Sequence, residues 1–67
     1  MGKKDEDYVI LRRKQVEART GLSRSSIYFN MAKNLFPKPI RLTERSIGWL
    51  ESEIQEWIND RISATRN

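Results

Sequence analysis

The sequence contains neither cysteine nor histidine. Without cysteine the chain has no disulfide framework and no zinc site built on thiolates. Without histidine it lacks the commonest metal ligand and the usual general base at neutral pH. In 67 residues we see no base or pocket that could activate a serine or tyrosine nucleophile. We therefore expect no metal, no other cofactor and no enzymatic activity.

Long apolar runs are absent as well. The longest is Tyr8 to Leu11, which is too short for a membrane span or for the core of a signal peptide. Apolar residues make up 37% of the chain, and a domain of this size buries only about 60% of its unfolded surface. We expect a soluble cytoplasmic protein with one thin core, no membrane partner and no small-molecule substrate.

The charge that is present is mostly positive. Lysine and arginine total 13 against 9 acidic residues, which gives a net charge of +4 and a pI of about 9.9. A small basic domain favours an anionic partner, and nucleic acid is the commonest one.

The order of helix signals predicts two short helices separated by a turn. Residues 13–20 are helix formers, and Gly21 can adopt the left-handed conformation that ends a helix. Ser23 is a typical N-cap for a second helix over 24–33, which Asn34 would end in the same way as Gly21. Two helices joined by a glycine-containing turn have the layout of a helix-turn-helix.

The second half of the chain predicts a hairpin and a third helix. Residues 36–39 contain two prolines and cannot be helical, whereas 40–42 and 46–49 alternate like strands around a turn at 43–45. Residues 51–63 have helical periodicity. One stripe of this helix consists of Ile54, Trp57, Ile58, Arg61 and Ile62. Its apolar members are expected in the core together with Trp49.

These elements predict a mostly α fold with a small β-hairpin wing, a winged helix-turn-helix over residues 8–63. Residues 1–7 are polar apart from Met1 and are predicted to form a disordered tail. Residues 64–67 are predicted to be a flexible C-terminus.

The second helix has a polar outward face near its start. With Ile27 pointing inward, a step of 100° per residue turns Ser25, Ser26, Phe29 and Lys33 outward and puts Tyr28 at the edge. Ser23 caps the helix, so Ser25 and Ser26 are interpreted as spare hydroxyls. In a helix-turn-helix this end of the second helix meets base edges in the major groove. Phe29 is open to three interpretations: a contact with a thymine methyl, a protein contact, or a core position that the phasing has missed.

The hairpin would add phosphate contacts, because it carries Lys38, Arg41 and Arg45 within eight residues. A wing of this kind reaches phosphates or the minor groove, where arginine is favoured. The residues expected to contact DNA are Ser23, Arg24, Ser25, Ser26, Tyr28, Phe29, Lys33, Lys38, Arg41, Arg45 and Ser46.

The ordered motifs resemble a known family. The segments RKQV at 13–16, TGLSRSSIY at 20–28, FPKPIRL at 36–42 and RSIGW at 45–49, with E53-I54 and W57-I58, are similar to AlpA-like phage and prophage transcriptional regulators. That resemblance covers about residues 9–62. Two positions depart from the family's pattern, because residue 29 is often basic there and residue 34 is often glycine.

The resemblance implies a winged helix-turn-helix related to the MerR DNA-binding domain and to phage excisionases. It also implies that Ser23 to Tyr28 open the recognition helix, that Arg45 and Ser46 lie in the wing, and that the protein acts on double-stranded DNA of a mobile element in a bacterial nucleoid.

Three hypotheses follow. The first is a sequence-specific DNA-binding transcriptional regulator. The second is an excisionase-like architectural factor that bends attachment-site DNA, and the third is a protein-interaction module without a DNA role. We also expect several copies to bind one site, because a single small domain makes few contacts.

Overall fold

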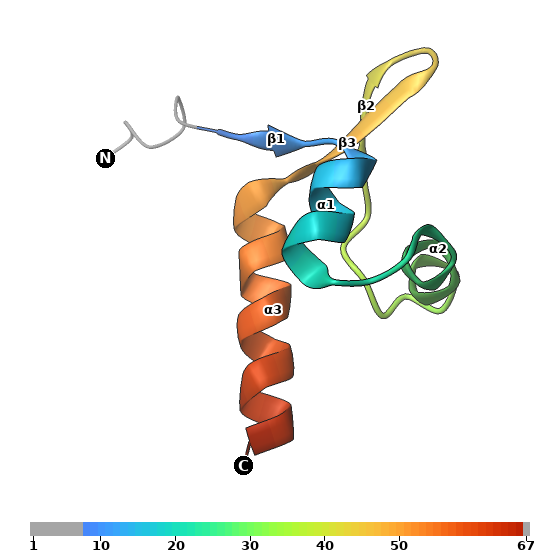
Figure 1. Cartoon of the computed structure of the whole chain (residues 1–67). Coiled ribbons are helices and arrows are strands. Elements are labelled where there is room, and N and C mark those ends of the chain that lie inside the picture. The colour runs from blue at the N-terminus through green and yellow to red at the C-terminus, as the bar shows by residue number, and fades with distance from the viewer. Residues whose placement is uncertain (1–7, 67) are drawn as a thin grey trace.

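A computed structural model describes residues 8–66 of the chain (Figure 1). The elements are, in order, β1 (Ile10–Leu11), α1 (Arg13–Thr20), α2 (Arg24–Ala32), β2 (Ile40–Thr43), β3 (Ser46–Leu50) and α3 (Glu51–Arg66). The predicted class is confirmed: the fold is mostly α with a small β wing, as in a winged helix-turn-helix. The predicted tail over 1–7 lies outside the described residues.

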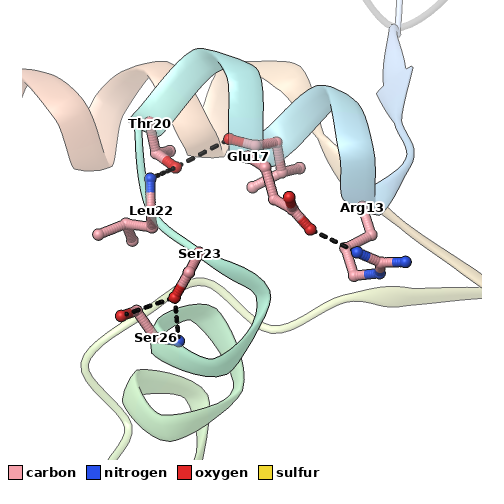
Figure 2. Close-up of polar contacts among 7 residues, drawn as sticks. Arg13, Glu17, Thr20, Leu22, Ser23 and Ser26 are labelled. Carbon is pink, nitrogen blue, oxygen red and sulfur yellow. Dashed lines mark hydrogen bonds and ion pairs between the residues drawn. The ribbon is translucent and has the colours of Figure 1, made fainter.

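The turn between α1 and α2 is fixed by backbone conformation and by one threonine. Gly21 has a φ of 77°, and its N–H donates to the carbonyl oxygen of Glu17 at 2.8 Å. The Thr20 hydroxyl donates to the Val16 carbonyl at 2.8 Å and accepts from the Leu22 N–H at 3.1 Å (Figure 2). The predicted left-handed stop at Gly21 is confirmed, and the turn is held by hydrogen bonds at both ends.

The end of α2 also follows the predicted left-handed stop. Asn34 has a φ of 62°, the only positive φ of a non-glycine residue between positions 8 and 66. The helix was expected to reach Lys33, but it ends at Ala32 and Lys33 is its C-cap. The Asn30 carbonyl accepts from the N–H of Leu35 at 2.8 Å, which tightens the last turn.

The wing belongs to a three-stranded antiparallel sheet with the order β1-β3-β2. Ile10 pairs with Leu50 and Leu11 with Trp49, so β1 covers one edge of β3. On the other edge β2 pairs with β3 up to Thr43 and Ser46, leaving a two-residue turn where three had been expected. The sequence identified residues 8–11 only as a short apolar run and predicted no partner strand for them.

The core takes one buried side chain from each element except β2, and one from the segment that follows α2. The buried side chains are Leu11, Val16, Ile27, Phe36, Trp49 and Ile54. Partly buried side chains that pack against them are Leu22, Met31, Ile47, Trp57 and Ile58. The inward phasing of Ile27 is therefore confirmed.

The end of α3 differs from the prediction. The helix continues to Arg66 instead of ending at Ser63, so residues 64–66, which were expected to be flexible, are helical. Ile62 was expected in the core but is 49% exposed. Figure 1 shows why: the last turns of α3 extend beyond the other elements, so the apolar stripe has nothing to pack against there.

The connector between α2 and β2 is anchored by both tryptophans. The Trp57 indole N–H donates to the Leu35 carbonyl at 2.9 Å, and the Trp49 indole N–H donates to the Pro37 carbonyl at 3.1 Å. The Phe36 ring meets the Trp57 ring edge-on, with centroids 4.9 Å apart.

No helix among residues 8–66 has the length and apolar character needed to cross a membrane.

Candidate nucleic-acid interface

The start of α2 uses two of its three serines for capping. The Ser23 hydroxyl oxygen accepts from the Ser26 N–H at 3.1 Å and donates to the Ser26 hydroxyl at 3.2 Å (Figure 2). Ser23 is therefore the N-cap, as predicted. The interpretation of Ser26 as a spare hydroxyl is wrong, because Ser26 is half-buried and its side chain completes the cap. Ser25 alone is an exposed hydroxyl with no described hydrogen bond.

The cations of α2 lie beside aromatic rings one helical turn away. The Arg24 guanidinium carbon is 5.9 Å from the centre of the Tyr28 ring, and the Lys33 ammonium nitrogen is 5.1 Å from the centre of the Phe29 ring. Both distances are within the range of a cation–π contact. All four side chains are exposed, so they form one mixed basic and aromatic surface along α2.

Phe29 is fully outside the core. Its side chain is 61% exposed, whereas Ile27, two residues earlier, is completely buried. The interpretation that the helical phasing had missed a core position at Phe29 is therefore wrong. The other two interpretations, a thymine contact and a protein contact, both require exposure and stay predictions.

The wing presents its cations to solvent. Arg41, Arg45 and the preceding Lys38 are exposed, whereas Ser46 is half-buried at the start of β3. The Arg45 N–H donates to the Thr43 hydroxyl at 3.2 Å, which orders the turn. Among residues 8–66 these three cations have no ion-pair partner.

One concave surface joins the helix-turn-helix to the wing. It has a volume of about 400 Å³ and lies between the start of α1, the middle of α2 and β3 with its turn. We call it the basic groove. Its lining consists of Arg12, Arg13, Lys14, Tyr28, Arg45 and Ile47.

Three of the groove's cations were absent from the sequence-based list of contacts. Arg12, Arg13 and Lys14 are consecutive, and this run of charge at the start of a helix was the signal that could have found them. The Arg12 Nε–H donates to the Ile47 carbonyl at 3.0 Å, which holds α1 against the wing strand. Arg13 pairs with Glu17 one turn along α1 (Figure 2). Lys14 is exposed and has no ion pair within the described residues.

The structure brings together only part of the predicted set. Tyr28 and Arg45 line the basic groove, although they come from different elements. Arg24, Ser25 and Phe29 are on α2 and Lys33 is its C-cap, but none of them lines the groove. Lys38 is on the connector and Arg41 is on β2. Four cations around one hollow, with a single carboxylate paired to one of them, create a positive potential that attracts an extended anion.

Comparison with known proteins identifies the family. Residues 9–62 match the family model described as "Prophage CP4-57 regulatory protein (AlpA)", a description of a regulator and not of an enzyme. The chain is 38% identical over 58 residues to the "DNA-binding transcriptional activator AlpA" of Escherichia coli (strain K12), a match that covers 78% of this chain and 83% of that protein.

A second relative comes from a phage. The chain is 38% identical over 56 residues to the "Uncharacterized protein ORF88" of Enterobacteria phage P4. This match covers 84% of the chain but only 64% of the phage protein, so the chain spans less than two thirds of that relative. Because the family model covers most of the described residues, the chain belongs to the AlpA family of prophage regulatory proteins.

Proposed function

We propose that this chain is a sequence-specific DNA-binding transcriptional regulator of a phage, prophage or mobile element. The observation that carries the proposal is the basic groove, which joins Lys14 on α1 and Arg45 in the wing beside the exposed surface of α2. Phosphate contacts fix the register of a protein on a duplex. A cationic groove next to a helix with free polar and aromatic side chains therefore suits a helix that reads bases.

In the proposed docking, α2 enters the major groove with Ser25 and Phe29 toward base edges. Arg24 and Lys33 neutralise phosphates at its sides, and Tyr28 is the residue of α2 that lines the basic groove. A hydroxyl can donate to or accept from a base, and an aromatic side chain can contact a thymine methyl. The α2 face thus contributes sequence preference, while the basic groove follows the backbone.

The wing contributes the second anchor. Arg45 at the hairpin turn and Arg41 on β2 are exposed cations on a short two-stranded ribbon. Such a ribbon reaches phosphate or a narrow minor groove, which attracts arginine. We further propose that several copies bind one site, because this docking offers few base contacts from α2 alone.

The relationship to the Escherichia coli protein supports the regulatory part of this proposal. That protein's name describes a DNA-binding transcriptional activator, and the match covers most of both chains. From that name we carry over to this chain only DNA binding and transcriptional regulation. Double-stranded DNA as the partner and a place in the bacterial nucleoid are our own parts of the proposal.

The test is selection of bound duplexes from a random DNA library at near-physiological salt. We expect one short motif to be enriched and to bind on the order of 10³-fold more tightly than random duplex. Salt-sensitive retention of all duplexes without enrichment would contradict sequence reading and favour an architectural role in DNA bending. A failure to retain any duplex would contradict the DNA-binding proposal as a whole.

A further inference from the structure

A second hollow has the opposite character to the basic groove. It has a volume of about 390 Å³ and lies between α3 and the connector that follows α2. We call it the acidic groove. Its lining consists of Asn34, Leu35, Phe36, Pro37, Trp57 and the three carboxylates Glu53, Glu56 and Asp60.

The floor of the acidic groove is apolar and firmly built. Leu35 is 59% exposed although it sits next to the buried Phe36. Its carbonyl oxygen accepts from the Trp57 indole N–H at 2.9 Å, which ties the backbone of the connector to α3 at this point. An aliphatic side chain held open to solvent beside a half-buried indole offers a place where one apolar side chain of a partner can be buried.

The rim of the groove is acidic on one side. One face of α3 carries all the groove residues of this helix, because their spacing follows the helical repeat. They are Glu53, Glu56, Trp57 and Asp60. Among residues 8–66 none of the three carboxylates has an ion-pair partner. They stand out because the chain has a net charge of +4.

The chemistry of the rim determines what kind of partner fits. No group of three acidic residues in the described part of the chain could hold a metal ion, so a bare cation does not explain the cluster. A phosphate backbone is repelled by it. A peptide segment with an apolar anchor flanked by lysine or arginine matches both the floor and the rim, because complementary charge steers and orients binding.

A second copy of the chain fits less well. The exposed basic and aromatic surface of a copy is the one formed by Arg24, Tyr28, Phe29 and Lys33 on α2. That surface is already assigned to DNA in the proposed function. The acidic groove shares no lining residue with the basic groove, so a protein partner can occupy it while DNA is bound.

We propose that the acidic groove is a docking site for a basic segment of a partner protein that inserts one apolar side chain against Leu35 and Trp57. The choice of a partner protein over a second copy rests on the proposed function, which assigns the α2 surface to DNA, but the test of the docking site uses no DNA. The two proposals can therefore fail separately.

The test uses a synthetic peptide of twelve alternating leucine and lysine residues as the probe and the full chain labelled with ¹⁵N. We expect the amide signals of Leu35, Glu53, Glu56 and Asp60 and the Trp57 indole N–H signal to shift on addition of the peptide. Signals of Lys14 and Arg45 in the basic groove should stay in place. Shifts spread over the whole surface, or no shifts, would overturn the proposal, as would equal shifts with the same peptide carrying glutamate in place of lysine.

Two double variants with the same change of net charge distinguish binding in the acidic groove from a general effect of charge on peptide binding. Glu56→Gln with Asp60→Asn raises the net charge by two units, and we expect it to weaken peptide binding about tenfold at low salt. Gln55→Lys with Asn59→Lys raises the net charge by the same amount on a face of α3 that does not line the groove, and should change affinity little. Equal weakening by both pairs would contradict a specific site. Shifts of the same amides with protein concentration alone would identify a second copy as the occupant and overturn the proposal.

Discussion

The residues of α2 show how a very small domain can keep its cations available. Arg24 and Lys33 lie over Tyr28 and Phe29, and neither has an ion pair with a carboxylate of the described chain. A guanidinium over a ring keeps its N–H groups free at the edge to donate to a phosphate. The rings thus hold the cations in place without neutralising them.

The serines at the start of α2 provide a residue-scale prediction. Ser23→Ala removes the cap and should lower the free energy of unfolding by about 1 kcal/mol. Ser25→Ala removes an exposed hydroxyl with no described partner, so stability should be unchanged. Under the proposed docking it should alter base preference at one or two positions by about 1–3 kcal/mol. Urea unfolding and binding to singly substituted duplexes measure the two effects. A stability loss in Ser25→Ala as large as that in Ser23→Ala would contradict these assigned roles.

Phe29 allows the thymine interpretation to be tested directly. Replacing each thymine of the selected motif in turn by uracil removes one methyl group and leaves base pairing intact. If Phe29 covers a thymine methyl, one replacement should cost the natural chain about 0.8 kcal/mol, the value for burying one methylene-sized group. The same replacement should cost Phe29→Ala nothing. If the effects of Phe29→Ala and of the uracil replacement on the binding free energy simply add at every thymine, Phe29 does not contact a thymine methyl.

At the scale of elements, the connector is the part that sequence patterns could not supply. The helix stops at Gly21 and Asn34, the Ser23 cap and the hairpin follow from local preferences of short segments, and all were predictable. The contacts of Trp49 and Trp57 with the connector join residues 12 and 22 positions apart, and no local rule encodes them. The pairing of β1 with β3 was missed for the same reason.

In the candidate site, too, the features set by local sequence were predictable and those formed by distant elements were not. The outward face of α2 was predictable from helical periodicity, because one buried residue, Ile27, fixes the phase of the whole helix. The basic groove was not predictable, because it forms only where α1, α2 and the wing meet. Ile62 was misplaced because periodicity shows which face of a helix is apolar but not how far its neighbours extend along it.

At the scale of elements, the two glycines in the described part of the chain should resist substitution for different reasons: Gly48 because of steric crowding and Gly21 because of its backbone conformation. A Cβ on Gly48 would lie 2.5 Å from Ile10 Cγ2 and 3.1 Å from the Leu11 carbonyl oxygen, so Gly48→Ala should push β1 away from β3. We expect a loss of about 1–3 kcal/mol, as for overpacking in a core.

Gly21 is the matched case, because nothing lies within 4 Å of a Cβ placed there but its φ is 77°. Gly21→Ala should cost about 1–2 kcal/mol through backbone strain alone. Gly21→Asn should cost less, since asparagine already adopts this conformation at position 34. Equal unfolding energies for Gly21→Asn and Gly21→Ala, or a neutral Gly48→Ala, would contradict the two mechanisms.

Considered as a whole, the molecule separates its charges. The basic groove joins α1, α2 and the wing, whereas the acidic groove lies along α3, which extends away from the wing (Figure 1). In the proposed complex with DNA, a field of this kind would orient the protein before contact, because a duplex attracts the basic side and repels the acidic side.

The salt dependence of the affinity for DNA tests whether the cations of the basic groove, and not the net charge of the whole molecule, control binding. If Arg45 contacts phosphate, Arg45→Ala should weaken binding to all duplexes and reduce the slope of log affinity against log salt by about 1. Lys14→Ala should act in the same way from the other side of the basic groove. Arg66→Ala, which removes the same charge near the end of α3, should leave the slope unchanged. An equal change of slope in all three variants would show that net charge, and not the groove, controls binding.

The pairing of Ile10 with Leu50 has a consequence for folding during synthesis on the ribosome. The first strand is synthesised early but finds its partner only after both helices of the helix-turn-helix, the connector and the hairpin have been made. Contacts so distant along the chain form late, because the intervening loop must close first. The nascent chain can therefore form α1 and α2 as it emerges, yet it cannot complete the sheet until β3 has left the exit tunnel, when only α3 remains to follow.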